Sequence, residues 1–142
     1  MKLVKHLLEE KGNDIWSIEP DRSVLDAIRM MAEKGIGALL IMKGDELMGI
    51  LSERDYARKV ILQGRSSKET SVHEIMTDKV FCTSPESSVE ECMALMTEKR
   101  IRHLPVVNSG AVIGVLSIGD LVKAKIEEQE FQIKQLENYI TA

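Results

Sequence analysis

The stretch Gly-Ile-Leu-Ser-Glu-Arg-Asp at residues 49–55 returns later in the chain as Gly-Val-Leu-Ser-Ile-Gly-Asp at residues 114–120. The same offset places Pro20 on Pro85, and the match continues without a gap over residues 15–61. A short pattern can recur by chance, but a register of this length indicates an internal duplication. The chain therefore holds two copies of one structural unit.

Each copy predicts the same order of secondary structure: strand, helix, strand, strand, helix. A serine N-cap precedes the first helix, with a carboxylate three residues later as in a capping box. The apolar residues of that helix recur at spacings of three and four, so one face is buried. Two apolar runs joined by turn-forming residues follow and predict a hairpin. The positions are 15–18 and 80–83 for the first strands, Ser23 and Ser88 for the N-caps, 38–42 with 47–51 and 104–107 with 112–116 for the hairpins, and Ser52 and Ser117 for the start of the second helices.

The two copies are expected to form one structure. A single copy of about 50 residues buries too little apolar surface to fold alone, so the copies should pack through their sheets. Residues 72–77 echo residues 4–8, so each copy is expected to begin with a short lead-in helix. The predicted domains are residues 1–62 for the first repeat with its lead-in helix, 63–71 for a polar linker, 72–126 for the second repeat, and 127–142 for a C-terminal helical extension.

Length, charge and motif content exclude several classes of protein. The chain has 142 residues, too few for a catalytic domain beside a regulatory one. Its net charge of -4 argues against a duplex nucleic-acid partner. No apolar run approaches the ~20 residues of a membrane-spanning helix, and the N-terminus leads into charges rather than a signal-peptide core. A cytoplasmic protein is therefore expected. A non-enzymatic one is expected because phosphate loops, nucleophile elbows and metal-ligand spacings are missing from the sequence.

The two cysteines, Cys82 and Cys92, lie ten positions apart without a second cysteine pair or a histidine cluster nearby. This pattern predicts two small core hydrophobes. A metal site and a disulfide are the alternatives.

The C-terminal segment keeps a helical pattern to its end. Its apolar residues recur mostly at spacings of three, four or seven, and such a stripe needs a surface to cover. The helix is expected either to wrap its own repeat pair or to form a dimer contact, and a homodimer is the prediction. The residues of the stripe are Val122, Ile126, Ile133, Leu136 and Ile140.

Four motifs occur in the order and spacing of a known family. They are Val72-x-x-Ile75-Met76-Thr77, Ser84-Pro85, Ile101-Arg102-His103-Leu104-Pro105-Val106-Val107, and Gly114-Val115-Leu116-Ser117-x-x-Asp120. With these motifs the chain resembles the CBS-domain pair, also called a Bateman module, over nearly its whole length. The first copy is fainter, since Gly37-Ala38-Leu39-Leu40 replaces the basic and proline positions.

The resemblance implies a fold, a ligand and a role. The fold class would be α+β, with two β-α-β-β-α units around a pseudo-twofold axis, their sheets face to face, plus a C-terminal helix. Two clefts between the units would bind an adenine nucleotide, AMP first, with ATP, ADP or NAD as alternatives. Such a module has no catalytic residues and would regulate a client protein, which the sequence does not name.

Two aspartates are the candidate ribose ligands. The family uses the aspartate of Ser-x-x-Asp at the start of the second helix, which corresponds here to Asp55 and Asp120. A carboxylate can accept hydrogen bonds from both ribose hydroxyls. The alternative is purely structural, because Ser-x-x-Asp at a helix start is also a capping box. Recurrence of the motif in both copies favours ligand binding.

Candidate phosphate donors are distributed unevenly. Arg102 and His103 match the family's basic pair, which in related proteins reaches a ligand held by the aspartate of the other copy. The resemblance therefore predicts one complete site from Asp55 with Arg102 and His103, supplemented by Arg54, Arg58 or Lys59. The second cleft would set Asp120 opposite Gly37 and Ala38 and bind more weakly. The alternatives are a solvated helix face for Arg54, Arg58 and Lys59, and a core position for His103.

An apolar slot for the base is expected from Ile18 with Leu39 and Leu40, or from Thr83 with Leu104. The alternative to nucleotide binding is a structural or interaction module that dimerises without a ligand. The complete set of predicted ligand-binding residues is Ile18, Pro20, Gly37, Ala38, Leu39, Leu40, Ser52, Arg54, Asp55, Arg58, Lys59, Thr83, Pro85, Arg102, His103, Leu104, Pro105, Ser117 and Asp120.

Overall fold

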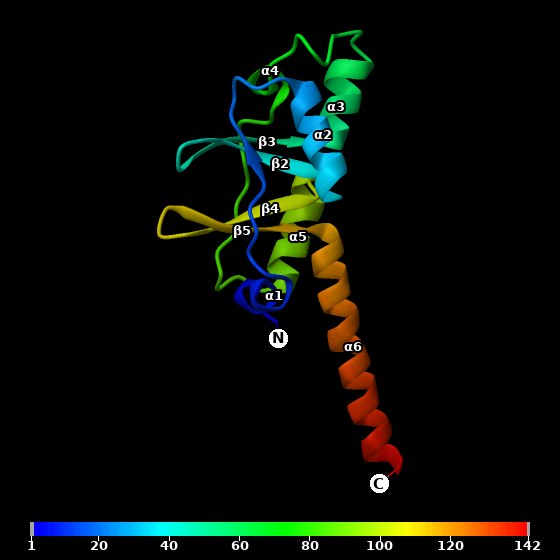
Figure 1. Ribbon diagram of the computed structural model, residues 1–142. Coiled ribbons are helices and arrows are strands. Elements are labelled where there is room, and N and C mark those ends of the chain that lie inside the picture. Colours follow the sequence, from blue (N-terminus) through cyan, green and yellow to red (C-terminus); the bar gives the residue numbers. More distant parts are fainter. Residues whose placement is uncertain (1, 142) are drawn as a thin grey trace. The chain divides into compact units, whose positions relative to one another are not determined.

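The computed structural model describes residues 2–141 and divides the chain into two compact units (Figure 1). Unit 2 is Ile15–Val80, and unit 1 combines the residues up to Asp14 with those from Phe81 onward. Helices and strands occur in both units, so the predicted α+β class is confirmed. The pseudo-twofold axis and the face-to-face sheets concern the placement of the units and stay predictions.

Unit 2 contains a three-stranded sheet with the order β1-β2-β3, in which β1 is parallel to β2 and β3 is antiparallel. Apolar side chains of α2, β2, β3 and α4 form its core, among them Met31, Leu39, Leu51 and Ile75. The elements are β1 (Ser17–Ile18), α2 (Val24–Lys34), β2 (Ala38–Lys43), β3 (Glu46–Ser52), α3 (Glu53–Tyr56), the π-helical turn η1 (Ala57–Ile61) and α4 (Val72–Ile75).

Unit 1 repeats this plan with two paired strands. The predicted strand at residues 80–83 is wrong: only Thr83 forms a bridge, parallel to Val106, so the equivalent of β1 is reduced to one residue pair. Its core joins Val4, Met96, Leu116 and other apolar residues. The elements are α1 (Val4–Lys11), α5 (Val89–Lys99), β4 (His103–Asn108), β5 (Ala111–Ser117) and α6 (Ile118–Thr141).

The predicted hairpins and helix starts are confirmed. Strands β2 and β3 pair with a bulge after Ile41, and β4 and β5 pair with a bulge after Val106, the equivalent position. The Ser23 hydroxyl accepts from the Asp26 amide at 3.1 Å, and the Ser88 hydroxyl accepts from the Glu91 amide at 3.1 Å. These local signals depend on short-range hydrogen bonds, which explains why they could be read from the sequence.

Each lead-in segment packs against the repeat that it does not precede in the sequence. Val4 and Leu7 of α1 lie in the core of unit 1, whereas Val72 and Ile75 of α4 lie in the core of unit 2. The sequence had assigned each lead-in helix to the repeat that follows it. In the structure the two repeats therefore exchange these segments.

Two equivalent glycines accommodate the exchanged segments. A Cβ atom on Gly49 would lie 2.6 Å from the Met76 Sδ atom and 2.8 Å from the Thr77 carbonyl oxygen. A Cβ atom on Gly114 would lie 2.7 Å from the Leu8 Cδ2 atom. Close approach of a crossing segment thus favours glycine at this point of each hairpin, most strongly at Gly49, where the neighbour includes backbone.

The cysteine prediction is half right. Cys92 is buried in the core of unit 1, as expected of a small hydrophobe, but Cys82 is exposed. Cys82 directly precedes Thr83, the residue that forms the single bridge of the expected strand. Neither cysteine forms a disulfide, and residues 2–141 contain no cluster of metal-ligating side chains.

Candidate functional site

Asp55 lies at the start of α3, where it completes a capping box. Its Oδ2 atom accepts hydrogen bonds from the Ser52 amide and the Ser52 hydroxyl, both at 3.0 Å. Lys59 lies one turn further on and places its ammonium 3.4 Å from Asp55 Oδ1. The same ammonium donates to the Ile75 carbonyl at 3.0 Å, which links the helix start to α4. The Asp55 side chain is 17% exposed and is therefore partly accessible.

Asp120 occupies the equivalent position in unit 1 but has a different cationic partner. Its Oδ2 atom accepts from the Ser117 amide at 2.8 Å and from the Lys11 ammonium at 2.6 Å. Lys11 also donates to the Val115 carbonyl at 2.7 Å. Burial favours a raised pKa for the Asp120 carboxyl, but the hydrogen bonds from Lys11 and Ser117 outweigh burial and lower that pKa. The Asp120 side chain is 27% exposed.

The start of one hairpin strand lies beside each aspartate-bearing helix start. The Glu53 amide donates to the Gly37 carbonyl at 3.0 Å, and Ala38 pairs with Ser52 in the sheet. The Ile118 amide donates to the Arg102 carbonyl at 2.8 Å in the same way. Each unit therefore places its Ser-x-x-Asp motif beside the start of its first hairpin strand. These neighbouring residues are Gly37 and Ala38 in unit 2, and Arg102 and His103 in unit 1.

The predicted basic pair is in the same unit as Asp120. His103 pairs with Ser117 in the sheet and is half-buried, whereas Arg102 is exposed. The predicted combination of Arg102 and His103 with Asp55 joins residues of different units and stays a prediction.

The other candidate cations of unit 2 lie on the surface. Arg54, Arg58 and Lys59 are all exposed, on α3 and the π-helical turn after it. Of these three described side chains, Lys59 is the one whose ammonium pairs with the Asp55 carboxylate. The alternative of a solvated helix face describes Arg54 and Arg58 well.

Most residues of the predicted apolar slot pack inside the units. Ile18 and Leu39 belong to the core of unit 2, and Leu104 belongs to the core of unit 1. Leu40 and Pro105 are also buried, and they occupy equivalent positions in β2 and β4. Only half-buried Thr83 leaves part of its side chain accessible, and its hydroxyl lies 3.3 Å from Cys92 Sγ. The apolar slot for a base therefore stays a prediction, because most of its side chains already pack in the cores of the two units.

The two predicted prolines support the lead-in segments. The Pro20 carbonyl accepts from the His73 amide at 3.1 Å, and the Pro85 carbonyl accepts from the Lys5 amide at 3.0 Å. Both prolines are half-buried. These equivalent bonds hold the start of each lead-in helix.

Sequence reasoning missed Lys11. It comes from α1, far from Asp120 in the sequence, and no spacing motif connects the two residues.

A duplicated ring contact was also missed. The Lys34 ammonium lies 4.2 Å from the centre of the Trp16 ring, and the equivalent Lys99 ammonium lies 5.1 Å from that of Phe81. The equal spacing of these four residues in the two copies was the available signal.

Comparison with solved structures supports the fold. A protein with CBS domains from Burkholderia ambifaria, described as a candidate signal-transduction protein, is 55% identical, with a TM-score of 0.87 over 90% of this chain and 96% of that one. The CBS-domain pair of protein MJ0100 has a TM-score of 0.80 over 90% of this chain and 98% of that one. It was crystallised with 5′-methylthioadenosine and S-adenosyl-L-methionine, but at 23% identity it shows the fold alone. A hexameric CBS-CP12 protein from bloom-forming cyanobacteria is 28% identical, with a TM-score of 0.77 over 85% of this chain and 70% of that one.

Sequence comparison identifies the family. The mitochondrial CBS domain-containing protein CBSX3 of Arabidopsis thaliana is 44% identical over 134 residues, which cover 91% of this chain and 65% of that protein. None of the helices within residues 2–141 is long and apolar enough to cross a bilayer. The model of the CBS domain matches residues 8–61 and 72–127, one match for each copy. The chain is therefore a member of the CBS-domain family, a non-catalytic tandem CBS pair.

Proposed function

We propose that the chain is a regulatory module that binds an adenine nucleotide, with AMP as the first candidate and ATP, ADP or NAD as alternatives. The observation that carries the proposal is the duplicated Ser-x-x-Asp helix start, at which Asp55 and Asp120 each keep a partly accessible carboxylate. A ribose offers two neighbouring hydroxyls, and one carboxylate can accept hydrogen bonds from both. The adenosyl ligands of the MJ0100 pair support the choice of ligand class.

The two aspartates should differ in affinity. Lys59 lies at the longer distance of 3.4 Å from Asp55, and its ammonium donates to the Ile75 carbonyl at 3.0 Å, so a ribose could take the carboxylate while Lys59 keeps that backbone bond. Lys11 comes from another helix, and its 2.6 Å bond to Asp120 is reinforced by a bond to Val115. A ribose at Asp120 would have to displace this lysine. We therefore expect Asp55, together with Arg102 and His103, to bind the charged nucleotide more tightly.

Nucleotide binding would act on a partner through the arrangement of the two repeats. A ligand shifts a conformational equilibrium only as far as its affinities for the two states differ. The client protein and the cytoplasmic location remain predictions. A structural module without a physiological ligand is the second candidate, and it is favoured by the exposed apolar side chains of α6, such as Leu136 and Ile140.

A thermal-shift panel of AMP, ADP, ATP, NAD and S-adenosylmethionine tests the proposal. A ligand at 100 times its dissociation constant stabilises the folded state by about 2.7 kcal/mol, which is easily measured. Asp55→Asn should abolish the shift, whereas Asp120→Asn should leave most of it. Asp26→Asn is the matched control, because Asp26 follows Ser23 in a similar helix cap outside the predicted site. No shift with any of the five ligands, or an equal loss in Asp26→Asn, would favour the structural module.

A further inference from the structure

The C-terminal half of α6 exposes apolar side chains beyond the body of unit 1. In Figure 1 this part of the helix runs clear of the other elements of that unit. Leu121 and Ala124 bury the first turns of α6 in the core of unit 1. From Gln129 to Ile140 every described side chain is exposed. The distal half of α6 therefore buries none of its described side chains in unit 1, and it is connected to that unit through the first half of the helix.

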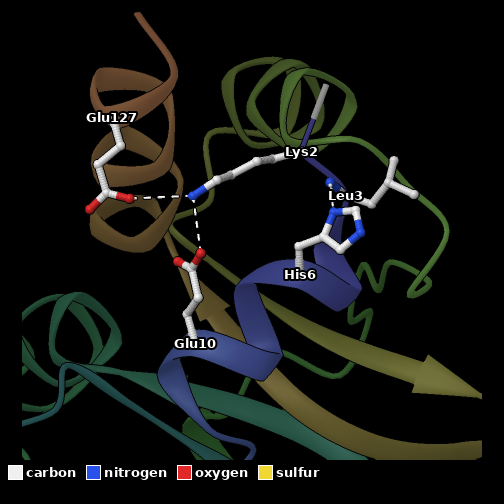
Figure 2. A network of polar contacts seen from close by, with 5 residues as sticks. All are labelled: Lys2, Leu3, His6, Glu10 and Glu127. Atoms are coloured by element: carbon white, nitrogen blue, oxygen red, sulfur yellow. Dashed lines mark hydrogen bonds and ion pairs between the residues drawn. The ribbon is translucent and has the colours of Figure 1, made fainter. Parts of the chain in front are cut away.

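Ion pairs to α5 and to Lys2, just before α1, anchor the first ten residues of α6. The Lys125 ammonium donates to Glu90 Oε1 of α5 at 2.8 Å. Figure 2 shows the Lys2 ammonium between Glu127 of α6, at 3.3 Å, and Glu10 of α1, at 3.2 Å. These contacts fix the direction in which the helix leaves unit 1. About twelve residues of helix would be marginal in water without further support, so the distal half calls for a covering surface.

The exposed apolar residues follow a heptad pattern. Spacings of four and three alternate along one seam, with isoleucine at all three a positions. Ile126, Ile133 and Ile140 occupy the a positions and are 49%, 55% and 78% exposed. The d positions hold Val122, Gln129 and Leu136.

The seam is distinct from the face of α6 that packs on unit 1. Leu121 and Ala124 lie at the c and f positions of the same heptads, on the other side of the helix. Phe131 continues that c/f face and, with Lys2, Glu127 and Glu128, lines a shallow open pocket. The helix thus presents one apolar face to its own unit and leaves a second one uncovered.

We propose that the seam pairs with the same seam of a second copy of this chain in a parallel, in-register two-stranded coiled coil. Isoleucine at the a positions 126, 133 and 140, with leucine at the d position 136, favours two strands over three or four in a parallel coiled coil. A second α6 offers the same heptad seam, so we take a second copy of the chain as the occupant.

Gln129 and the flanking charges select the parallel arrangement. In register, Gln129 meets Gln129 of the second copy at a d position, where the two amides can hydrogen-bond each other. An antiparallel pair of full overlap would set the amide against isoleucine and leave it without a polar partner. It would also place Glu130, at an e position, against Glu130 of the second copy. The parallel pair instead faces the e-position Glu137 with the neutral Gln132 at g.

The proposal is tested on the full chain by sedimentation equilibrium with matched aspartate variants. The wild-type chain should have twice the mass of one chain. Ile133→Asp should raise the dimer dissociation constant at least about 100-fold, because two charges would be buried in the seam. Phe131→Asp is the control, since it removes an equally exposed apolar side chain, 63% against 55%, outside the seam. A monomeric wild type, or equal effects of the two substitutions, would overturn the proposal.

Orientation is tested by cross-linking, which also covers the case that Ile133→Asp fails to fold. In a Cys82→Ser background, Gln129→Cys should form a disulfide-linked dimer under mild oxidation, because a d residue meets its own copy only in the parallel register. Leu136→Cys should behave in the same way. A control cysteine at Gln135, on the c/f face, should cross-link at least ten times more slowly. Equal rates at positions 129 and 135 would overturn the proposal. The proposed coiled coil does not depend on nucleotide binding. A negative thermal-shift panel would therefore leave it standing, and a negative cross-linking result would leave the proposed nucleotide site standing.

Discussion

The Lys11 ammonium donates a 2.6 Å hydrogen bond to Asp120, although 109 residues separate the two in the sequence. The bond joins the end of the N-terminal lead-in helix α1 to the helix start of the second repeat. It exists because the repeats exchange their lead-in segments. The exchange thus gives Asp120 a cation that the local sequence does not supply.

Replacing Lys11 by methionine should make unit 1 less stable above pH 4. The pair is partly exposed, so we expect a loss of about 1 kcal/mol in the free energy of unfolding at pH 7. The pKa of Asp120 is lower in the folded chain than in the unfolded chain, so the stabilisation is complete above the unfolded value of about 4 and disappears as the pH falls through the folded value. Urea unfolding of both proteins at pH 7 and pH 3 measures the difference.

The Lys11 experiment has a matched control in the same helix. Lys5 forms an exposed ion pair with Glu86 at 3.4 Å. Lys5→Met should therefore cost only a few tenths of a kcal/mol at either pH. An equal loss in the two variants at pH 7 would argue against a special role for the Lys11 bond.

Lys11→Met should also improve nucleotide binding at the Asp120 site, if the proposed function holds. Removing the ammonium frees the carboxylate for a ribose, and we expect the weaker of two dissociation constants to fall by about tenfold, equivalent to ~1.4 kcal/mol. Isothermal titration calorimetry with AMP resolves the two sites. Weaker binding in Lys11→Met would instead indicate that Lys11 is itself a phosphate donor.

Alanine at the two crossing glycines should destabilise the chain by different amounts. At Gly49 the new methyl group meets the Thr77 backbone at 2.8 Å, which cannot move aside easily, so we expect a cost of about 2–3 kcal/mol. At Gly114 the obstacle is the flexible Leu8 side chain, and the cost should be about 1 kcal/mol. Denaturant unfolding measures both.

Two further variants check this interpretation. Leu8→Ala combined with Gly114→Ala should cost less than the sum of the single changes, because the smaller side chain makes room for the methyl group. Gly119→Ala should be neutral or stabilising, since its Cβ atom would meet only the Ser117 hydroxyl at 3.6 Å. Full additivity in the double variant would contradict the proposed clash.

The two thiols should react with a disulfide reagent at different rates. Cys82 is exposed and should react in the folded chain, whereas Cys92 is buried and should react only after denaturation. Partial desolvation raises the pKa of the Cys82 thiol above its ordinary value, and burial does the same for Cys92, so labelling of Cys82 at pH 8 should be slower than that of free cysteine and should accelerate as the pH rises. Rapid labelling of both thiols in the folded chain would contradict the packing of unit 1.

The sequence predicted features that depend on neighbouring residues. The capping serines Ser23 and Ser88 and the hairpin registers follow from hydrogen bonds and side-chain periodicity within a few residues. The first strand of the second repeat was predicted less well, because its apolar side chains satisfy the same pattern whether or not a full strand pairs. Only Thr83 forms the bridge, and Cys82 beside it is exposed.

The sequence alone determined the duplication, the order of the long helices and hairpin strands within each copy and the two Ser-x-x-Asp helix starts, because each of these depends on local residue types and on their equal spacing. Only the tertiary structure decided which lead-in helix packs on which repeat, and with it the pairing of Lys11 with Asp120 and the close approach of the lead-in segments to Gly49 and Gly114. Both lead-in segments are amphipathic and similar, so either repeat could bury either one. Which repeat buries which lead-in segment is set by contacts between residues far apart in the sequence, and these form only in the folded chain.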